Sequence, residues 1–249
     1  MRPPLLLATA AGDRTLRDLD APLDLDRLVP GVGPWEVEIG FGKGRYLLRR
    51  ALAEPQRRFL GLEVAAEYFG LLVGRARRRG AANLVAIRGE AQGALAAVLP
   101  RGFAEAVHVY FPDPWPKARH ERRRLFAPES VDLVLGLLRP GGTLFFATDF
   151  LEYGEAVAAL LGGHPGATVT RLESGWPEGP RTNYEAKYLV EGRPILRLAV
   201  AWSGLAGAAA LHPDARPGLL AAWREAPALD GGGGAGIAAR ALPGEGPAG

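Results

Sequence analysis

Residues 35–54, WEVEIGFGKGRYLLRRALAE, pass from an apolar strand pattern through a glycine-rich loop into a helical pattern. Gly40, Gly42 and Gly44 lie between the two patterns, where small residues let a ligand approach backbone N–H groups at a helix N-terminus. A dinucleotide-binding loop requires a third glycine at the position of Arg45, and a phosphate-binding P-loop requires Ser or Thr where Gly44 stands. The stretch therefore predicts a strand, a ligand-binding loop and a helix, without the full signature of either nucleotide-binding loop.

Apolar runs of strand length alternate with helical patterns from Trp35 to about Leu161. This alternation is typical of a parallel sheet that is covered by helices, so the predicted fold class is α/β. Two later apolar runs, in residues 167–174 and 193–202, predict closing strands. The five runs of the main pattern lie in residues 35–44, 57–64, 83–90, 106–111 and 143–149.

A helix is predicted between the fourth and fifth of these strands. Pro128 suits the first helical position, because its fixed φ is helical and its missing N–H is not needed there. An apolar stripe with helical spacing follows at Val131, Val134, Leu135 and Leu138. The sequence RPGG, residues 139–142, is predicted to end this helix.

The 249 residues, 48% hydrophobic and 23% charged, suffice for one sizeable α/β domain with a tail or for two small domains, and one domain is the preferred interpretation. We expect this domain in residues 35–202, preceded by a segment (1–34) that packs on the core or only precedes it. We expect a mobile, Ala/Gly/Pro-rich extension in residues 203–249. The net charge is only +3, but the pI of about 9.4 and the local arginine clusters suit a polyanionic partner. An arginine-rich soluble protein of high-GC origin fits the composition equally well.

The chain contains no cysteine, which excludes disulfides, thiolate zinc sites, iron–sulfur clusters and a cysteine nucleophile. We expect no metal in the protein. The apolar run in the first residues, MRPPLLLATAAGDR, is short for a signal peptide, and prolines interrupt its head. No apolar stretch approaches the ~20 residues that span a bilayer, so we expect a cytoplasmic protein that does not bind membranes.

Acidic residues lie at the carboxyl ends of three of the predicted strands, at Glu38, Glu63 and Asp113. Carboxylates at this edge would repel a pyrophosphate, whereas they would attract a ligand that carries an ammonium and a sulfonium, such as S-adenosylmethionine. Glu63 lies about twenty residues beyond the glycine loop, where doubly wound folds hydrogen-bond a ribose diol. The alternative is that all three are ordinary residues at strand ends.

Prolines stand at every second position of residues 112–116, PDPWP. Each fixes its own φ and favours an extended conformation in the residue before it. We therefore predict a stiff segment with Asp113, Trp115 and Lys117 on one side. The alternative is a rigid surface turn with a half-buried tryptophan. A run of cations follows directly, which predicts contacts with a phosphate backbone, although such a run is also typical of a solvated surface.

Five stretches of the sequence together resemble the bacterial tRNA (guanine-N7)-methyltransferases, the TrmB family. The resemblance extends from about Trp35 to Trp202, and PDPWPK followed by RH and basic residues is its most specific part. The stretches are VEIGFGKG, FLGLEV, YFPDPWPKARHERRR, ATDF and TNYEAKYLVEGRPI.

The resemblance implies a class I Rossmann-like methyltransferase with a seven-stranded, mostly parallel sheet and helices on both faces. It also implies S-adenosylmethionine-dependent methylation of guanine N7 in the variable loop of tRNA. The cofactor-binding positions, which include two loop glycines, are Glu38, Gly40, Gly42, Glu63, Glu90 and Asp113. Asp113 is also the family's active-site position. The family usually has Asp or Asn where this chain has Glu90, which leaves that contact with the adenine open.

The family's substrate contacts match Lys117, Asp149, Thr182, Asn183, Tyr184 and Glu185. Its RNA-binding segment matches Lys117 to Arg124, with Arg119, His120, Arg122, Arg123 and Arg124 as the basic side chains. From the residues alone, Asp149 also suits a cap of the helix after it. Thr182 with Glu185 likewise suits a capping box.

Guanine N7 is a lone-pair acceptor, so methyl transfer to it is a direct in-line displacement that needs no strong general base. A carboxylate such as Asp113 or Asp149 would favour the cationic purine that forms. The base has to be extruded from the tRNA, and Trp115 or Tyr184 offers it a stacking surface. Two other functions stay open: a methyltransferase for a small molecule or another RNA base, and an RNA-binding protein that has lost activity. The oligomeric state, the role of the extension and the range of tRNAs also stay open.

Overall fold

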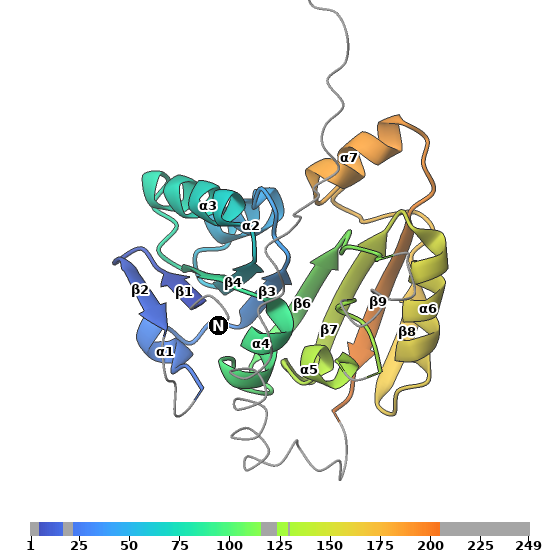
Figure 1. Ribbon diagram of the computed structural model, residues 1–249, viewed down its shortest axis with the longest axis horizontal. Coiled ribbons are helices and arrows are strands. Elements are labelled where there is room, and N and C mark those ends of the chain that lie inside the picture. Colours follow the sequence, from blue (N-terminus) through green and yellow to red (C-terminus); the bar gives the residue numbers. More distant parts are fainter. Residues whose placement is uncertain (1–4, 17–21, 116–123, 129, 205–249) are drawn as a thin grey trace, which may run out of the picture.

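The sheet and its helices form within the residues that the computed structural model describes, 5–16, 22–115, 124–128 and 130–204 (Figure 1). The expected mobile extension lies almost entirely outside these residues. The strands are β1 (Leu5–Ala8), β2 (Asp13–Leu16), β3 (Trp35–Ile39), β4 (Arg58–Glu63), β5 (Leu84–Arg88), β6 (Ala104–Tyr110), β7 (Leu138–Thr148), β8 (Ala167–Arg171) and β9 (Leu196–Trp202). The helices are α1 (Leu25–Leu28), α2 (Arg45–Ala53), α3 (Ala66–Arg78), α4 (Ala91–Ala97), α5 (Val131–Leu135), α6 (Leu151–Gly162) and α7 (Asn183–Val190).

The strand order is β2-β1-β5-β4-β3-β6-β7-β9-β8. Strands β3 to β7 are parallel to one another, whereas β9 runs antiparallel to both of its neighbours, β7 and β8. The chain winds from β3 through β4 to β5 on one side and continues with β6 and β7 on the other. In such sheets ligands bind outside the carboxyl ends of the strands at this reversal, which places the expected site at the ends of β3, β4 and β6.

All seven expected strands form, and the α/β class is confirmed. The sheet is larger than expected because the N-terminal hairpin adds two more strands, in which β1 pairs antiparallel with β5. Leu6 lies opposite Arg88 in this pairing. The hairpin covers the edge of β5, which would otherwise expose unpaired backbone groups. Strands of four residues carry too little alternation to be predicted from the sequence.

The predicted helix after Pro128 is shorter than expected, and its predicted end is wrong. Helix α5 spans only Val131–Leu135, and residues 139–142, RPGG, lie inside strand β7. The pairing of β6 with β7 shifts register at this point. A side chain at Gly142 would meet the carbonyl oxygen of Glu105 at 3.0 Å, and Gly141 has a φ of 83°. The irregular pairing of β6 with β7 therefore requires these glycines, because the backbones approach closely there.

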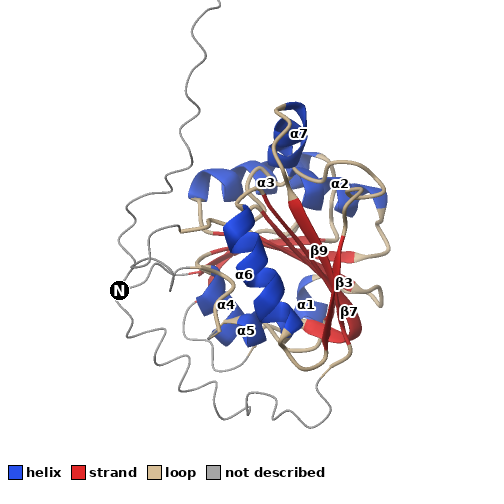
Figure 2. Ribbon diagram, turned by 90° about the vertical axis from the view of Figure 1, so that its right-hand side faces the viewer, coloured by secondary structure: helices blue, strands red, loops and turns tan. Residues whose placement is uncertain are grey.

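The two faces of the sheet are covered by different helices. One apolar cluster joins α1, α4, α5 and α6 to one face, and Figure 2 shows the last three of these together on that face. A second cluster joins α2 and α3 to the other face. Side chains alternate along β3, so Val37 and Ile39 enter the first cluster, while Glu36 and Glu38 point to the side of α2. Within the described ranges, no helix has the length and apolar character that crossing a membrane requires.

Candidate active site

The glycine loop between β3 and α2 combines open space with close packing. Gly40, Gly42 and Gly44 have φ values of 75°, 50° and 67°, a left-handed conformation that side chains disfavour. A side chain at Gly44 would meet Leu72 of α3 at 2.6 Å, so this glycine lets α2 pack against α3. A side chain at Gly40 or Gly42 would meet nothing within 4 Å. The first two glycines therefore border open space at the carboxyl end of β3.

Glu38 is a buried carboxylate beside this loop. The residue is 2% exposed, and its Oε2 has no hydrogen-bond partner among the described residues. Burial raises the pKa of Glu38 well above its ordinary value, and the charge of Glu63 adds to this effect. The backbone N–H of Leu47 and the charge of Arg181 act in the opposite direction. A buried carboxylate oxygen without a partner is costly, so this site favours a ligand that brings a positive charge.

Glu63, at the end of β4, holds the glycine loop in place. Its Oε2 accepts a hydrogen bond from the N–H of Gly42 at 2.8 Å. Its Oε1 accepts from the N–H groups of Val64 and Ala65, both at 2.9 Å. A carboxylate has about four acceptor positions, so Glu63 retains acceptor capacity for the ribose hydroxyl groups that the sequence predicted. That contact stays a prediction.

Glu90 follows β5 and caps helix α4, where its side chain accepts from the N–H of Gly93 at 3.1 Å. It extends the row of acids to a fourth strand, because Glu38, Glu63 and Asp113 belong to β3, β4 and the end of β6. These strands are adjacent in the sheet, in the order β5-β4-β3-β6. The structure thus brings all four predicted cofactor acids to the carboxyl edge. The predicted contact of Glu90 with an adenine stays a prediction.

Asp113 follows β6, and its carboxylate is open to solvent although partial desolvation raises its pKa. The extended conformation expected for this segment is wrong at Trp115, which has a φ of 40°. Phe111 is also left-handed, with a φ of 52°. Such non-glycine residues cost about 1–3 kcal/mol each and are retained where tertiary contacts hold them. Here the N–H of Phe111 donates to the carbonyl of Ala147 at 2.7 Å, and its ring packs against Tyr188.

Arg124 is the last residue of the basic segment, and it contacts the described residues that precede the segment. Its Nε donates to the carbonyl of Pro114 at 2.8 Å, and its Nη2 donates to the carbonyl of Trp115 at 3.3 Å. Its guanidinium also lies over the ring of Tyr153, 5.2 Å from the centroid. The RNA contact predicted for Arg124 stays a prediction. The other predicted contacts of this segment lie outside the described residues: Lys117, Arg119, His120, Arg122 and Arg123.

Thr182 caps helix α7, as the capping interpretation predicts, because its Oγ1 accepts from the N–H of Glu185 at 3.0 Å. Glu185 does not complete a capping box. The residue is 1% exposed, and its Oε2 accepts from the N–H of Arg181 at 2.8 Å and from the indole of Trp176 at 3.0 Å. Its Oε1 accepts from the Nε of Arg197 at 2.7 Å. In this conformation Glu185 anchors α7 to the sheet and is covered from solvent.

The first two residues of α7, Asn183 and Tyr184, are exposed and face the acidic edge. The Oδ1 of Asn183 accepts from the Nη1 of Arg45, the first residue of α2, at 2.9 Å. Tyr184 is 47% exposed. Burial raises the pKa of Tyr184, and so do the neighbouring Tyr68 and the charges of Asp113 and Glu63. The phenol of Tyr184 therefore lies among groups from β4, α3 and the segment after β6.

Asp149 follows β7 at the same edge of the sheet. The interpretation of Asp149 as a helix cap is wrong, because Phe150 is the N-cap of α6 and no side chain caps that helix. Its Oδ2 lies 3.4 Å from the Nη1 of Arg193, just beyond α7. The carboxylate therefore lies between the end of β7 and the end of α7. Its predicted substrate contact stays a prediction.

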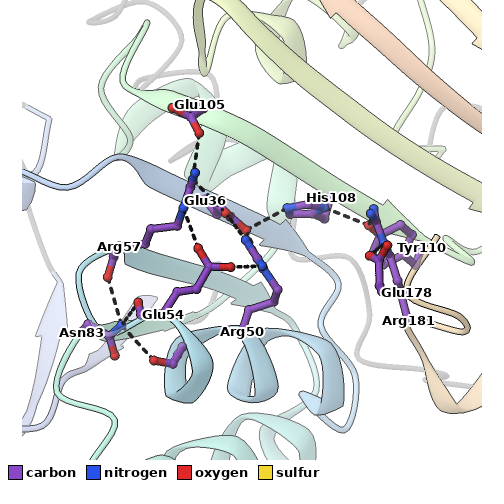
Figure 3. A network of polar contacts seen from close by, with 11 residues as sticks. Glu36, Arg50, Glu54, Arg57, Asn83, Glu105, His108, Tyr110, Glu178 and Arg181 are labelled. Atoms are coloured by element: carbon purple, nitrogen blue, oxygen red, sulfur yellow. Dashed lines mark hydrogen bonds and ion pairs between the residues drawn. The ribbon is translucent and has the colours of Figure 1, made fainter. Parts of the chain in front are cut away.

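A buried polar network runs across neighbouring strands of the sheet, on the side of α2 (Figure 3). It was not predicted from the sequence. Glu36 Oε1 accepts from Arg50 at 2.6 Å and from Arg57 at 3.0 Å, and Glu36 Oε2 lies 3.3 Å from His108 Nε2. Burial opposes ionisation of Glu36, but the interactions with His108 and Arg50 prevail and lower its pKa to about 2. The sequence did contain a signal for this network. Charged or polar residues stand at alternate positions of two apolar central strands, at 36 and 38 and at 108 and 110.

The network continues from His108 to the segment before α7. His108 Nδ1 lies 2.8 Å from the hydroxyl of Tyr110, which accepts from Arg181 Nη1 at 2.6 Å. Burial lowers the pKa of His108 and so favours the neutral imidazole. One direction of donation then fits the two hydrogen bonds: Arg181 donates to Tyr110, and Tyr110 donates to His108 Nδ1. The proton of the imidazole is then on Nε2, which lies 3.3 Å from Glu36 Oε2 but outside hydrogen-bond geometry. The network thus connects a carboxylate under α2 with a guanidinium before α7.

The reversal of strand order at β3, the open glycine loop and the row of acids define a class I S-adenosylmethionine-dependent methyltransferase. A solved structure of a 16S rRNA (adenine(1408)-N(1))-methyltransferase from Catenulisporales acidiphilia, with the cosubstrate SAM, shares this fold. It aligns with a TM-score of 0.53 and 20% identity over 81% of this chain and 98% of that chain. S-adenosylmethionine fits the site, because Glu38 presents a buried carboxylate oxygen without a partner among the described residues.

A family model described as "Putative methyltransferase" matches residues 33–198. The tRNA (guanine-N(7)-)-methyltransferase of Nitrosococcus oceani is 40% identical over 64% of this chain and 67% of its own length. The enzyme of the same name from Leifsonia xyli subsp. xyli is 42% identical over 71% of this chain and 79% of its own length. The chain belongs to the tRNA (guanine-N7)-methyltransferase family.

Proposed function

We propose that this protein transfers a methyl group from S-adenosylmethionine to N7 of a guanine in the variable loop of tRNA. One observation carries the cofactor part of this proposal: the buried Glu38 carboxylate lies next to a loop whose glycines border open space, and one of its oxygens has no hydrogen-bond partner in the described part of the chain. The family relationship supports the guanine and the tRNA. Because tRNA is the substrate, we propose that the protein acts in the cytoplasm.

In the proposed site Glu38 binds the ammonium of the cofactor, and Gly40 and Gly42 leave room for its backbone approach. Glu63 and Glu90 accept hydrogen bonds from the ribose and the adenine. The bound cofactor supplies a methyl group on a positively charged sulfur, which is ready for attack by a lone pair. Glu63 has a second role, because the same carboxylate holds the N–H of Gly42 and so sets the shape of the loop.

Asp113 acts on the guanine through charge. Guanine N7 has no proton to lose, so the site needs orientation and charge stabilisation more than it needs a base. The purine becomes cationic as the new bond forms, and an ionised carboxylate beside the ring lowers the energy of that charge. Asp113 suits this role because its carboxylate is open to the carboxyl edge while partial desolvation strengthens its field.

Helix α7 presents the substrate-binding side chains. Asn183 and Tyr184 are exposed at its first turn, and Tyr184 offers a ring face on which an extruded base can stack. The hydroxyl of Thr182 is occupied by the cap. The buried Glu185 orients this turn by holding the N–H of Arg181 and the guanidinium of Arg197. We therefore assign Glu185 a positioning role in place of direct contact with the guanine.

The proposal is tested by incubating the protein with labelled S-adenosylmethionine and unmodified tRNA, followed by nucleoside mass analysis. We expect 7-methylguanosine in wild-type reactions and none with tRNA whose variable-loop guanine is replaced by adenine. A different methylated nucleoside would show that the protein acts on another base. Cofactor binding without any methylated product would favour an RNA-binding protein that has lost activity. Glu38→Gln is the matched protein control, because it keeps the shape of the side chain and removes its charge.

A further inference from the structure

Arg181 is a buried guanidinium in the segment between β8 and α7. The residue is 7% exposed. Its Nη1 donates to the hydroxyl of Tyr110 at 2.6 Å, and its Nε donates to Glu178 at 2.7 Å. Its plane is surrounded by aromatic rings, and Trp176 is the nearest, with its centroid 4.0 Å from the guanidinium carbon. Phe145 and Tyr46 follow at 4.7 and 5.3 Å. The side chain is therefore held from several directions.

The backbone of Arg181 is held by the helix that follows it. Its N–H donates to Glu185, whose other carboxylate oxygen accepts from Arg197 on β9. Trp176, which stacks against the Arg181 guanidinium, also donates to Glu185. Glu185 and Arg181 thus connect the first turn of α7 to the sheet, through Arg197 on β9 and Tyr110 on β6. Figure 3 shows Arg181 and Tyr110 together at one end of the buried network.

The positive charge of Arg181 also acts on the cofactor pocket. It lowers the pKa of Glu38, against the effect of burial and of Glu63. The other ionisable groups coupled to Glu38 are Tyr46 on α2 and Tyr110 on β6, and burial raises the pKa of both phenols, so they are neutral. The strand pairing supplies the geometry of this coupling: Glu38 lies opposite His108 in the pairing of β3 with β6, and Tyr110, the next residue on the same face of β6, accepts from Arg181. Arg181 and Glu38 therefore lie on the same face of the sheet.

We propose that Arg181 is a positioning residue with two separable roles: its charge keeps the cofactor carboxylate Glu38 ready for a cationic ligand, and its hydrogen bonds set the substrate helix α7 against the sheet. This inference rests on the proposed function, since it concerns the same cofactor and tRNA. No role of this kind follows from the sequence pattern, because Arg181 precedes the TNYE stretch and carries no motif of its own.

Two substitutions separate the roles. Arg181→Lys keeps the charge but loses the planar stack and the forked donation to Tyr110 and Glu178. Arg181→Met keeps much of the apolar volume among the aromatic rings and removes the charge. Tyr110→Phe is a third variant, which removes the acceptor of Arg181 Nη1 and leaves the charge in place. Arg171→Met is the matched control, because Arg171 is an exposed arginine whose side chain pairs with Glu155 of α6.

The first measurement is cofactor affinity by calorimetry between pH 5 and 7.5, without tRNA. An ionised Glu38 binds the cofactor ammonium, so affinity rises with pH as Glu38 loses its proton. Without the Arg181 charge the proton is held more tightly, so in Arg181→Met the rise moves to higher pH. Affinity below the midpoint then falls about tenfold for each pH unit of displacement. We expect Arg181→Lys, Tyr110→Phe and Arg171→Met to keep the wild-type profile.

The second measurement is steady-state methylation with varied tRNA at saturating cofactor. We expect Arg181→Lys and Tyr110→Phe to raise KM for tRNA about tenfold while kcat changes less, because α7 loses its fixed orientation. Arg171→Met should leave both constants unchanged. Thermal unfolding of each variant identifies any loss of fold. If Arg181→Met does not fold, Arg181→Lys and Tyr110→Phe still test the role in α7, and the pH profile of a charge-neutral Arg181→Gln tests the role at Glu38.

Two results would overturn the inference. The first is an unchanged pH profile of cofactor binding in a folded variant that lacks the charge. The second is an unchanged KM for tRNA in both Arg181→Lys and Tyr110→Phe. Failure of the proposed function looks different, since wild-type protein would then fail to bind the cofactor or to methylate tRNA. The calorimetric arm uses no RNA and no activity, so it separates the two outcomes.

Discussion

Asn183 on α7 accepts a hydrogen bond from Arg45, the first residue of α2, across 2.9 Å. Through this contact the helix that carries the predicted substrate residues is joined to the helix that leaves the glycine loop. The contact links residues 138 positions apart in the chain. The glycine loop and α7, which are the proposed binding elements for the cofactor and the tRNA, are therefore physically connected at the surface of the site.

We predict that Asn183→Ala raises KM for tRNA about fivefold, because loss of one exposed hydrogen bond corresponds to about 1 kcal/mol. Asn183→Asp keeps an acceptor for Arg45 and should stay near the wild-type value. Steady-state kinetics with varied tRNA measures both. If Asn183→Asp were as impaired as Asn183→Ala, the amide nitrogen would be the important group, and Asn183 would act on the substrate directly.

Glu38→Gln should weaken binding and strengthen the fold. Removal of one partner of a buried ion pair costs about 2–5 kcal/mol, so cofactor affinity should fall by at least about 30-fold. The folded-state pKa of Glu38 is raised above the ordinary carboxyl pKa of 4.5. The free energy of unfolding therefore falls as pH rises from 4.5 to the folded-state pKa, because the unfolded chain loses this proton more readily than the folded one. The stability gain of Glu38→Gln should accordingly be larger at pH 8 than at pH 5. Calorimetry and denaturant unfolding measure the two effects, and a variant that is less stable at pH 8 would contradict this account.

Asp113→Asn should lower the single-turnover methylation rate about 100-fold, which is typical for removal of one group that stabilises transition-state charge. Its exposed carboxylate has no structural role in the described contacts, so the unfolding midpoint should not change. Wild-type activity should rise with pH as Asp113 ionises, over a range displaced upward from the ordinary value of 3.8, and Asp113→Asn should lack this rise. Asp149→Asn is the comparison, with a smaller expected loss because Arg193 lies 3.4 Å from that carboxylate.

Glu36→Gln should destabilise the fold by about 3 kcal/mol at neutral pH, because its charge holds Arg50 and Arg57 beneath the sheet. The folded-state pKa of Glu36 is lowered to about 2, so this contribution is present above the ordinary value of 4.5 and is lost as pH falls toward 2. The difference between wild type and variant should therefore shrink between pH 4.5 and 2. Denaturant unfolding at several pH values checks this.

The control for that experiment is Glu155→Gln, which breaks an exposed pair with Arg171. Exposed ion pairs contribute little to stability, so this variant should match wild type at every pH. Equal destabilisation by both substitutions would mean that general surface charge, and not the buried network, controls the acid response of the protein.

Much of the site was predictable because parallel strands end at a common edge of the sheet. The alternation of apolar runs and helical periods located β3 to β7, and acids at the carboxyl ends of those strands, such as Glu38 and Asp113, therefore had to lie along that edge. The glycines of residues 40–44 were also predictable, because only small residues leave such a loop open. The family motifs supplied the substrate class, which periodicity and charge alone left undecided.

What the sequence by itself determined is the α/β class, the position of the ligand loop and the acidic edge, since these follow from period, strand direction and charge. Only the tertiary structure decided that Arg181 stacks among aromatic rings, that Glu185 is buried beneath α7, and that Phe111 and Trp115 adopt left-handed backbones. Each depends on which distant segments pack against one another. Local preference sets the face on which a side chain lies, whereas its partner on that face is chosen by the packing of the whole chain.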